Sequence, residues 1–282
     1  MVVIAKNGAA IPTLFLIPGQ GGSTFNLIKL GRLLNFDGRV AAVPPRGLRR
    51  DDKPHLSMKD MVEYYLSVIL RCQPRGPYIL LGYSLGGVVA FAVAHRLMQT
   101  GRNVVFLGLL DSYPDFRQWP FRVQLSVARQ RAKYRIGWFL RARFIDSVAF
   151  TYWFVTRRWR SSPARFSPPS RRRLFVDTKK ELVLIDAVGR AQLKALTTYR
   201  PNFYPGKVTF IQPHQLHPAL PHSPNSVWGQ YVSTLETLVT SGDHESLFQE
   251  PFVTHLAHTL SVQIKASLAS STAAAMVESE TW

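Results

Sequence analysis

A serine in a glycine-rich hexapeptide is the residue of this sequence best placed to do chemistry. Ser84 is the centre of Gly-Tyr-Ser-Leu-Gly-Gly at 82–87, which follows an apolar run at 78–81 and opens a largely apolar stretch at 88–98. A strand, a sharp turn with a central serine and a buried helix, in this order, form a nucleophile elbow. Small neighbours are needed there because the helix packs closely on the strand and a Cβ would collide. The pattern predicts that Ser84 is a nucleophile.

A serine hydroxyl is a poor nucleophile near neutral pH, so the chain must also supply a base and a carboxylate that orients this base. On α/β-hydrolase folds the three groups follow the chain order serine, acid, histidine, each at the end of a strand. His244 comes directly after the last expected strand, at 234–240, and before the last expected helix, at 251–262. This position predicts that His244 is the base.

The acid is identified by elimination. Many α/β-hydrolases place it after the next-to-last strand, but residues 187–235, which include that loop, contain no Asp or Glu. Asp111 ends the central apolar run that follows the elbow helix. Asp243 adjoins His244, and neighbouring loop residues rarely direct both side chains into one hydrogen bond. We therefore interpret Asp243 as a turn-former and predict Asp111 as the acid.

The developing oxyanion needs two backbone N–H groups aimed at it. One is expected from Leu85, the residue after the nucleophile. The other is expected from Gln20, in the loop Pro-Gly-Gln-Gly-Gly at 18–22, where glycines let the backbone approach a substrate. No Gly-Lys-Ser/Thr follows these glycines, so nucleotide binding is unsupported.

The elements that must position these groups alternate along the chain. Short apolar runs alternate with longer segments of helical periodicity, and this alternation predicts a mostly parallel sheet with crossover helices. The expected strands are 13–17, 39–43, 78–81, 104–110, 207–211 and 234–240, and the expected helices are 25–34, 57–71, 88–98 and 251–262.

The same pattern sets the domain organisation. The alternation stops at Ser112 and resumes at Lys207, so about 112–206 is expected to be a helical lid inserted over the edge of the sheet. We predict one domain of the α/β class, an α/β-hydrolase fold at 1–265. The low-complexity end, 266–282, is expected to be a disordered tail.

The positive charge gathers in the expected lid. The chain carries a net charge of +18, and residues 117–173 hold fifteen Lys/Arg and one acid, Asp146, interleaved with aromatic residues. Three interpretations stay open: a solvated basic face, a docking surface for an acidic carrier protein or for the phosphates of coenzyme A, and contact with membrane headgroups. We favour carrier or coenzyme A docking. No sequence motif supports nucleic-acid binding.

Composition argues against several other classes. A single cysteine, Cys72, excludes an internal disulfide framework and a multi-cysteine metal site. His214, His217 and His222 share a proline-rich loop, but no carboxylate or cysteine is near, so no metal and no cofactor is expected. The N-terminus lacks the features of a secretory signal, and no uncharged apolar run approaches the roughly 18 residues that cross a bilayer. A cytoplasmic protein is the expectation.

With these residues in place, the chain resembles the thioesterase domains that terminate nonribosomal peptide and polyketide synthetases, which are α/β-hydrolases. The likeness rests on five stretches: PGQGG at 18–22, GYSLGG at 82–87, LLDS at 109–112, YRPNFYPGKVTF at 199–210 and SGDHESLFQEP at 241–251. In that family the acid follows the strand after the elbow helix, in agreement with Asp111.

The resemblance also implies a reaction. Ser84 would be acylated by a chain carried on a phosphopantetheine thioester, and His244 would then activate water or an internal nucleophile to release it. A carrier protein or a synthetase is the implied partner. Tyr83 makes the elbow similar to the synthetase-terminal type. Since the first expected strand begins by about residue 12, with no carrier domain before it, we expect a free-standing enzyme.

Two alternatives remain. An esterase or acyltransferase would use the same three residues and deliver the acyl group to an alcohol or amine, which product analysis distinguishes. A non-catalytic binding or membrane-associated protein on a hydrolase scaffold would leave Ser84 unreactive toward a fluorophosphonate probe.

Overall fold

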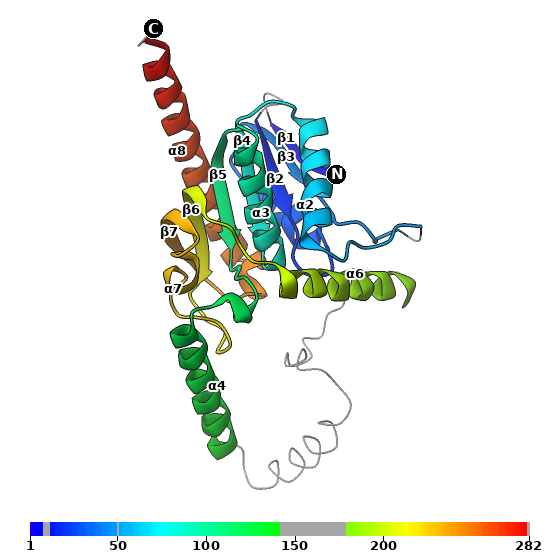
Figure 1. The fold of residues 1–282 in the computed structure, drawn as a ribbon, viewed down its shortest axis with the longest axis vertical. Helices are drawn as coiled ribbons and strands as arrows, with labels where there is room; N and C mark the ends of the chain where they lie inside the picture. The colour runs from blue at the N-terminus through cyan, green and yellow to red at the C-terminus, as the bar shows by residue number, and fades with distance from the viewer. Residues whose placement is uncertain (8–11, 50, 142–178, 281–282) are drawn as a thin grey trace.

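In the computed structural model, which describes residues 1–7, 12–49, 51–141 and 179–280, the strands form one seven-stranded sheet of order β1-β3-β2-β4-β5-β6-β7 (Figure 1). The strands are β1 (Val2–Asn7), β2 (Thr13–Ile17), β3 (Gly38–Ala42), β4 (Tyr78–Tyr83), β5 (Val104–Leu110), β6 (Tyr204–Pro213) and β7 (Val232–Thr240). β1 pairs antiparallel with β3, and every other neighbouring pair is parallel. The parallel strands therefore end at one edge, where loops can bring functional side chains together.

Helices cover both faces of this sheet because the central strands are apolar on both sides. Along β2, Phe15 and Ile17 join the core shared with α2 (Met58–Cys72) and α3 (Leu85–Gln99). Leu14 and Leu16, which alternate with them, join the core shared with α1 (Phe25–Leu33) and α8 (Phe252–Glu280). The strand period of two thus divides one apolar run between two cores.

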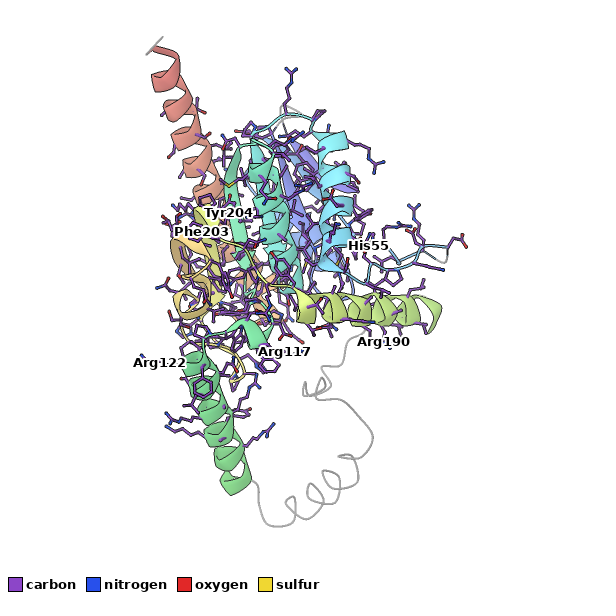
Figure 2. The ribbon with its side chains drawn as sticks, viewed as in Figure 1. His55, Arg117, Arg122, Arg190, Phe203 and Tyr204 are labelled. Atoms are coloured by element: carbon purple, nitrogen blue, oxygen red, sulfur yellow. The ribbon has the colours of Figure 1, made fainter. Side chains whose placement is uncertain are left out.

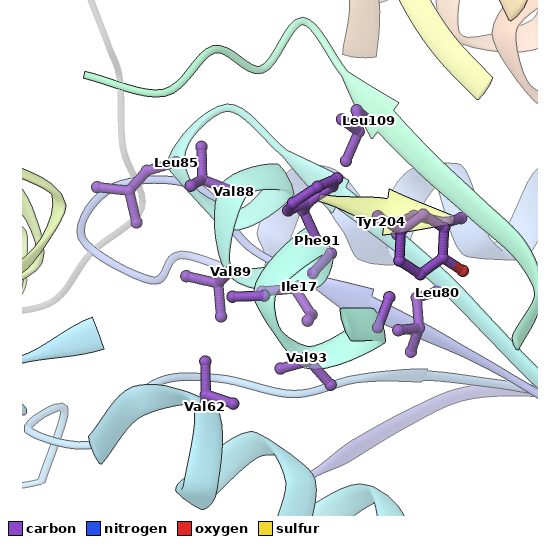
Figure 3. Packing of buried hydrophobic residues seen from close by; sticks show 14 of the residues in the cluster. Ile17, Val62, Leu80, Leu85, Val88, Val89, Phe91, Val93, Leu109 and Tyr204 are labelled. Atoms are coloured by element: carbon purple, nitrogen blue, oxygen red, sulfur yellow. The ribbon is translucent and has the colours of Figure 1, made fainter. Parts of the chain in front are cut away.

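The elbow helix α3 lies in the first of these cores. Its apolar side chains meet those of β2, β4, β5 and α2, as Figure 3 shows around Phe91. Eleven residues of α3 are buried. Such a helix can move little relative to the sheet, so the turn before it has a defined geometry.

The predicted lid contains two described helices, α4 (Phe121–Arg141) and α6 (Lys179–Thr198), and the short 3₁₀ helix η1 (Phe116–Gln118). In Figure 1, α4 extends away from the sheet, while α6 lies across the end of α2. Val127 of α4 is buried against the core, which anchors the first turns of that helix. The expected basic segment continues past Arg141 into 142–178, outside the described residues.

The remaining connections carry two short helices, α7 (Asn225–Trp228) and η2 (Ser246–Phe248). Trp228 is fully buried, and its indole Nε1–H donates to the carbonyl of Ser112 at 2.8 Å. The loop between β6 and β7 is therefore tied to the end of β5.

The predicted α/β class and the parallel alternation are confirmed, with two differences. β1 was not predicted: it is an edge strand paired on one side only, so its short sequence lacks the doubly buried pattern of the others. The expected disordered tail from 266 is wrong for the described residues, since α8 continues to Glu280. Ala has the highest helix propensity, and Leu268 packs on the core, so the helix that begins at Phe252 extends through the low-complexity stretch.

The segments that the structure describes include no helix both long enough and apolar enough to cross a membrane.

Candidate active site

Ser84 lies in a strained turn between β4 and α3. Its backbone has φ 54° and ψ −127°, a conformation that residues with a side chain rarely adopt. The Ser84 N–H donates to the carbonyl of Leu110 on β5 at 2.9 Å, and its own carbonyl accepts the N–H of Gly87 at 3.0 Å. Strain of this kind persists only where the surroundings enforce it. The geometry is that of the predicted nucleophile elbow.

The glycines of the elbow are required by contact. A Cβ on Gly82 would collide with the carbonyl of Gly86, and one on Gly86 would collide with the carbonyl groups of Ile17 and Pro18. The expectation that the elbow needs small neighbours is therefore confirmed, with the reason visible in the close crossing of α3 over β4 and the end of β2.

Asp111 and His244 form a short hydrogen bond beside this turn. Asp111 Oδ2 and His244 Nδ1 are 2.6 Å apart, and their side chains are 4% and 32% exposed. Because an ionised carboxylate only accepts, Nδ1 carries the proton and donates it, which leaves Nε2 as the acceptor nitrogen. A buried acid thus holds the imidazole in the tautomer that a general base requires.

Asp111 reaches this position because β5 is the immediate neighbour of β4 in the sheet. Leu110, the last residue of β5, pairs with Tyr83, the last residue of β4, so Ser84 and Asp111 leave adjacent strands at the same level. Asp111 itself has φ 43° and donates its N–H to Ile211 of β6 at 2.9 Å. His244 arrives from the loop after β7, across β6.

Asp243 has a different function in that loop. Its Oδ1 accepts the N–H of Ser246 at 2.8 Å and that of Glu245 at 2.9 Å. The N–H of Ser246 is the main cause that lowers the pKa of the Asp243 carboxyl, with a smaller contribution from Glu245. These bonds are those of a side-chain-closed turn. The interpretation of Asp243 as a turn-former is confirmed.

The loop after β2 approaches Ser84 with its backbone. Gly21 and Gly22 have φ of +80° and +77°, which favours glycine, and the N–H of Gly22 donates to Gly19 at 3.0 Å. The Gly21 N–H is bound by the side chain of Gln192 from α6 at 2.8 Å. Gln20, at the bend of this turn, is exposed and faces the same pocket as Ser84. Leu85 is the first residue of α3, where backbone N–H groups lack intrahelical acceptors.

A pocket of about 760 Å³ brings the five residues predicted from sequence together. These are Gln20, Ser84, Leu85, Asp111 and His244. Much of the remaining wall is apolar and comes from the lid and the loop after β6, with Tyr113, Trp119, Leu193, Leu196 and Leu220 among its residues. A volume and lining of this kind suit an organic ligand with an apolar part.

Sequence reasoning gave three residues no part in this site. Tyr83 contacts His244, Gln192 contacts the loop after β2, and His217 lines the pocket. Desolvation lowers the pKa of His217, and the neighbouring His244 lowers it further. Its Nδ1 accepts the N–H of Ala219 at 3.1 Å, so in the neutral ring the proton is on Nε2. Only the serine-adjacent place of Tyr83 gave any signal in the sequence.

The loop histidines considered for a metal were His214, His217 and His222. Within the described ranges, no group of three or more His, Cys, Asp or Glu side chains is arranged to hold a metal ion.

Part of the chain is similar to one family of known proteins. Residues 12–146 match the thioesterase domain family. A stretch of 119 residues is 40% identical to the nonribosomal peptide synthetase btyA of Aspergillus terreus, covering 42% of this chain and 13% of btyA. The chain therefore spans a small part of the length of this relative.

Two solved structures illustrate the likeness of the fold. The NocB thioesterase domain, solved as a covalent complex with a fluorophosphonate nocardicin G analog, aligns with a TM-score of 0.58 at 21% identity, over 91% of this chain and 94% of that one. ClbQ, from the colibactin nonribosomal peptide and polyketide pathway, aligns with a TM-score of 0.62 at 15% identity, over 93% and 99%. At this identity the likeness establishes the fold, that of an α/β-hydrolase.

Proposed function

We propose that this chain, which carries a thioesterase domain sequence over residues 12–146, releases acyl chains from phosphopantetheine thioesters through an acyl-Ser84 intermediate. The observation that carries the proposal is the 2.6 Å hydrogen bond between Asp111 and His244, in the pocket that also contains Ser84. A serine at a strained elbow, a histidine whose Nε2 is the acceptor nitrogen and a buried carboxylate are the three groups that acyl transfer by a serine hydrolase uses.

In the first half-reaction, Nε2 of His244 takes the proton of the Ser84 hydroxyl as the oxygen attacks the thioester carbonyl carbon. The Asp111 carboxylate stabilises the resulting imidazolium through Nδ1–H. The backbone N–H groups of Leu85 and Gln20 donate to the oxyanion of the tetrahedral intermediate. The carbon–sulfur bond then breaks, His244 returns the proton to the departing thiolate, and the acyl group stays on Ser84.

In the second half-reaction, His244 takes a proton from water as the water oxygen attacks the ester carbonyl of acyl-Ser84. Collapse of the second tetrahedral intermediate returns the proton to the Ser84 oxygen and releases a carboxylic acid. An amine or hydroxyl of the acyl chain itself could replace water here, which would release a cyclic product.

The acyl group proposed for this reaction is apolar near the thioester. Tyr113 and Trp119 face the pocket from the segment after β5, and Leu193 and Leu196 face it from α6. A charged acyl group against these walls would lose hydration without gaining a partner. An uncharged alkyl or aryl chain is the better fit.

The thioester carrier is proposed to bind the basic part of the lid. Four basic side chains are exposed on η1 and α4: Arg117, Arg122, Arg129 and Lys133. Figure 2 labels the first two, near the N-terminal end of α4. Cations on a surface next to a pocket attract an acidic carrier protein or the phosphates of coenzyme A. Raising the salt concentration should therefore lower kcat/KM for a carrier-bound substrate. An unchanged kcat/KM would argue against docking through charge.

Two measurements test the reaction. The folded wild-type chain should be labelled by a fluorophosphonate on Ser84, identified by peptide mass, while Ser84→Ala should not be labelled. The wild type should also release thiol from an acyl-CoA or acyl-N-acetylcysteamine thioester, detected with a disulfide reagent. Absence of labelling in folded protein would indicate a non-catalytic scaffold. Labelling with ester hydrolysis but no thioester hydrolysis would indicate an esterase.

A further inference from the structure

The tyrosine before the nucleophile is bonded to the residue that carries the proposed base. Tyr83 is the last residue of β4, and its hydroxyl donates to the backbone carbonyl of His244 at 2.7 Å. The two residues are 161 positions apart in the chain. This bond ties the loop after β7 directly to the elbow.

The same tyrosine also contacts the imidazole. The rings of Tyr83 and His244 are stacked with centroids 4.8 Å apart and an interplanar angle of 28°. Phe248 of η2 meets the tyrosine ring edge-on at 4.8 Å, which restrains its orientation. The Tyr83 hydroxyl thus holds the backbone of His244, and the Tyr83 ring contacts its side chain.

The Tyr83 ring also packs against the loop after β2. A Cβ built on Gly19 would lie 3.0 Å from the tyrosine ring and 3.2 Å from the Ser84 Cβ. The ring is therefore packed closely against the backbone from which the Gln20 N–H is proposed to donate. Tyr83 contacts the loop of the base and the loop of the oxyanion donor at the same time.

We propose that Tyr83 is a positioning residue that sets the plane and the height of the His244 imidazole relative to Ser84. This inference rests on the proposed function of Ser84 and His244. The hydrogen bond that His244 Nδ1–H donates to Asp111 fixes one ring nitrogen but leaves the ring free to tilt about that bond. Stacking on Tyr83 removes the tilt, and the hydroxyl bond fixes the backbone from which the side chain extends.

Stacking has a second consequence for the reaction. In each half-reaction His244 becomes an imidazolium, and an aromatic face attracts a cation that lies against it. The tyrosine face therefore stabilises the protonated base more than the neutral base. Because this preference appears as the proton is transferred, its loss should lower kcat and leave KM unchanged.

Two variants separate the ring from the hydroxyl. Tyr83→Phe keeps the stacked ring and removes the bond to the His244 carbonyl, while Tyr83→Leu removes both. We expect the rate of fluorophosphonate labelling at Ser84 to fall about threefold to tenfold in Tyr83→Phe and about 30-fold to 100-fold in Tyr83→Leu. With a thioester substrate, the same decreases should appear in kcat, with KM within about twofold of the wild type.

The matched control is Tyr64→Phe. The Tyr64 hydroxyl also donates to a backbone carbonyl, that of Pro44 at 3.2 Å, but Tyr64 does not line the pocket. Its labelling rate should equal that of the wild type. Thermal melting of each variant, compared with the assay temperature, shows whether a loss of rate follows from unfolding.

Two results would overturn the proposed role of Tyr83. Labelling of Tyr83→Phe and Tyr83→Leu at the wild-type rate would overturn the proposal, as would a decrease expressed in KM alone. If Tyr83→Leu does not fold, the comparison of Tyr83→Phe with Tyr64→Phe decides the matter. Labelling needs no thioester: a chain that is labelled at Ser84 but releases no thiol would contradict the proposed function and still test the role of Tyr83.

Discussion

The two walls of the pocket are built in different ways. At the strand ends, Ser84 and Asp111 have positive φ and lie between buried elements, and His244 is fixed to Asp111 at 2.6 Å. Opposite, the wall from the lid is lined by apolar side chains, and the lid helix α4, which contributes no residue to that lining, has exposed Arg and Lys side chains over 122–135. The first wall tolerates little change in geometry, whereas the second offers an apolar surface to a substrate. This difference suggests that the core determines the reaction and the lid determines the substrate.

The largest effect should come from the acid of the rigid wall. Asp111→Asn removes the charge that orients His244 and stabilises the imidazolium, so kcat should fall about 10³–10⁴-fold. Asp243→Asn should stay within about threefold of the wild type, because an asparagine oxygen can still accept the N–H groups of Glu245 and Ser246. Thioester turnover of the two variants measures the contrast. Loss in Asp243→Asn with activity in Asp111→Asn would reverse the assignment of the acid.

The stiffness of the elbow can be tested with two glycines. Gly86→Ala would push a Cβ into the carbonyl groups of Ile17 and Pro18, so the free energy of unfolding should fall by about 3 kcal/mol. Gly101→Ala is the control, since φ there is +70° but nothing lies within 4 Å of the added Cβ. Gly101→Ala should lower the free energy of unfolding by about 1 kcal/mol, because of backbone strain alone. Denaturant unfolding gives both values, and equal costs would show that the elbow is not closely packed.

The two walls meet at Gln192, where the lid helix α6 binds the Gly21 N–H. Gln192→Leu leaves that N–H without its acceptor and frees the loop that carries Gln20, so kcat should fall about tenfold. Gln230→Leu, at an exposed position outside the pocket, should change nothing. Steady-state kinetics on a small thioester compares them. An unaffected Gln192→Leu would mean that the core wall works without support from the lid.

The smallest effect on chemistry should come from the basic face of the lid. The double variant Arg122→Glu and Lys133→Glu reverses two exposed charges of α4, and should lower kcat/KM about threefold to tenfold for a carrier-bound substrate. For a small uncharged thioester, kcat/KM should be unchanged. Lys59→Glu, on the exposed side of α2, is the control. Equal losses with both substrates would show that α4 affects the reaction itself.

Much of the rigid wall could be predicted because short segments of sequence determine it. The elbow is marked by three glycines within six residues, Gly82, Gly86 and Gly87, and its flanking strand and helix are largely apolar. Asp111 could be found because residues 187–235 lack a carboxylate. Each of these inferences needs only the order of elements, which parallel α/β folds restrict strongly.

Other features depended on contacts between distant residues. Tyr83 and His244 are 161 positions apart, and Gly21 and Gln192 are 171 apart. The spacing of residues in the sequence does not predict that α6 of the lid contacts the loop after β2. β1 and the extension of α8 were missed for a different reason. β1 pairs on one side only, and residues 266–273 of α8 are exposed or half-buried, so both patterns are weak.

The sequence by itself determined the fold class, the elbow at Ser84 and the two residues that pair as Asp111 and His244. It could do so because strand ends in a parallel sheet converge at one edge, whatever the details of packing. The tertiary structure decided how the imidazole is oriented, which side chains form the apolar walls and where α6 supports the loop after β2. These depend on side-chain contacts across the whole chain, which form only when the sheet, its helices and the lid are assembled.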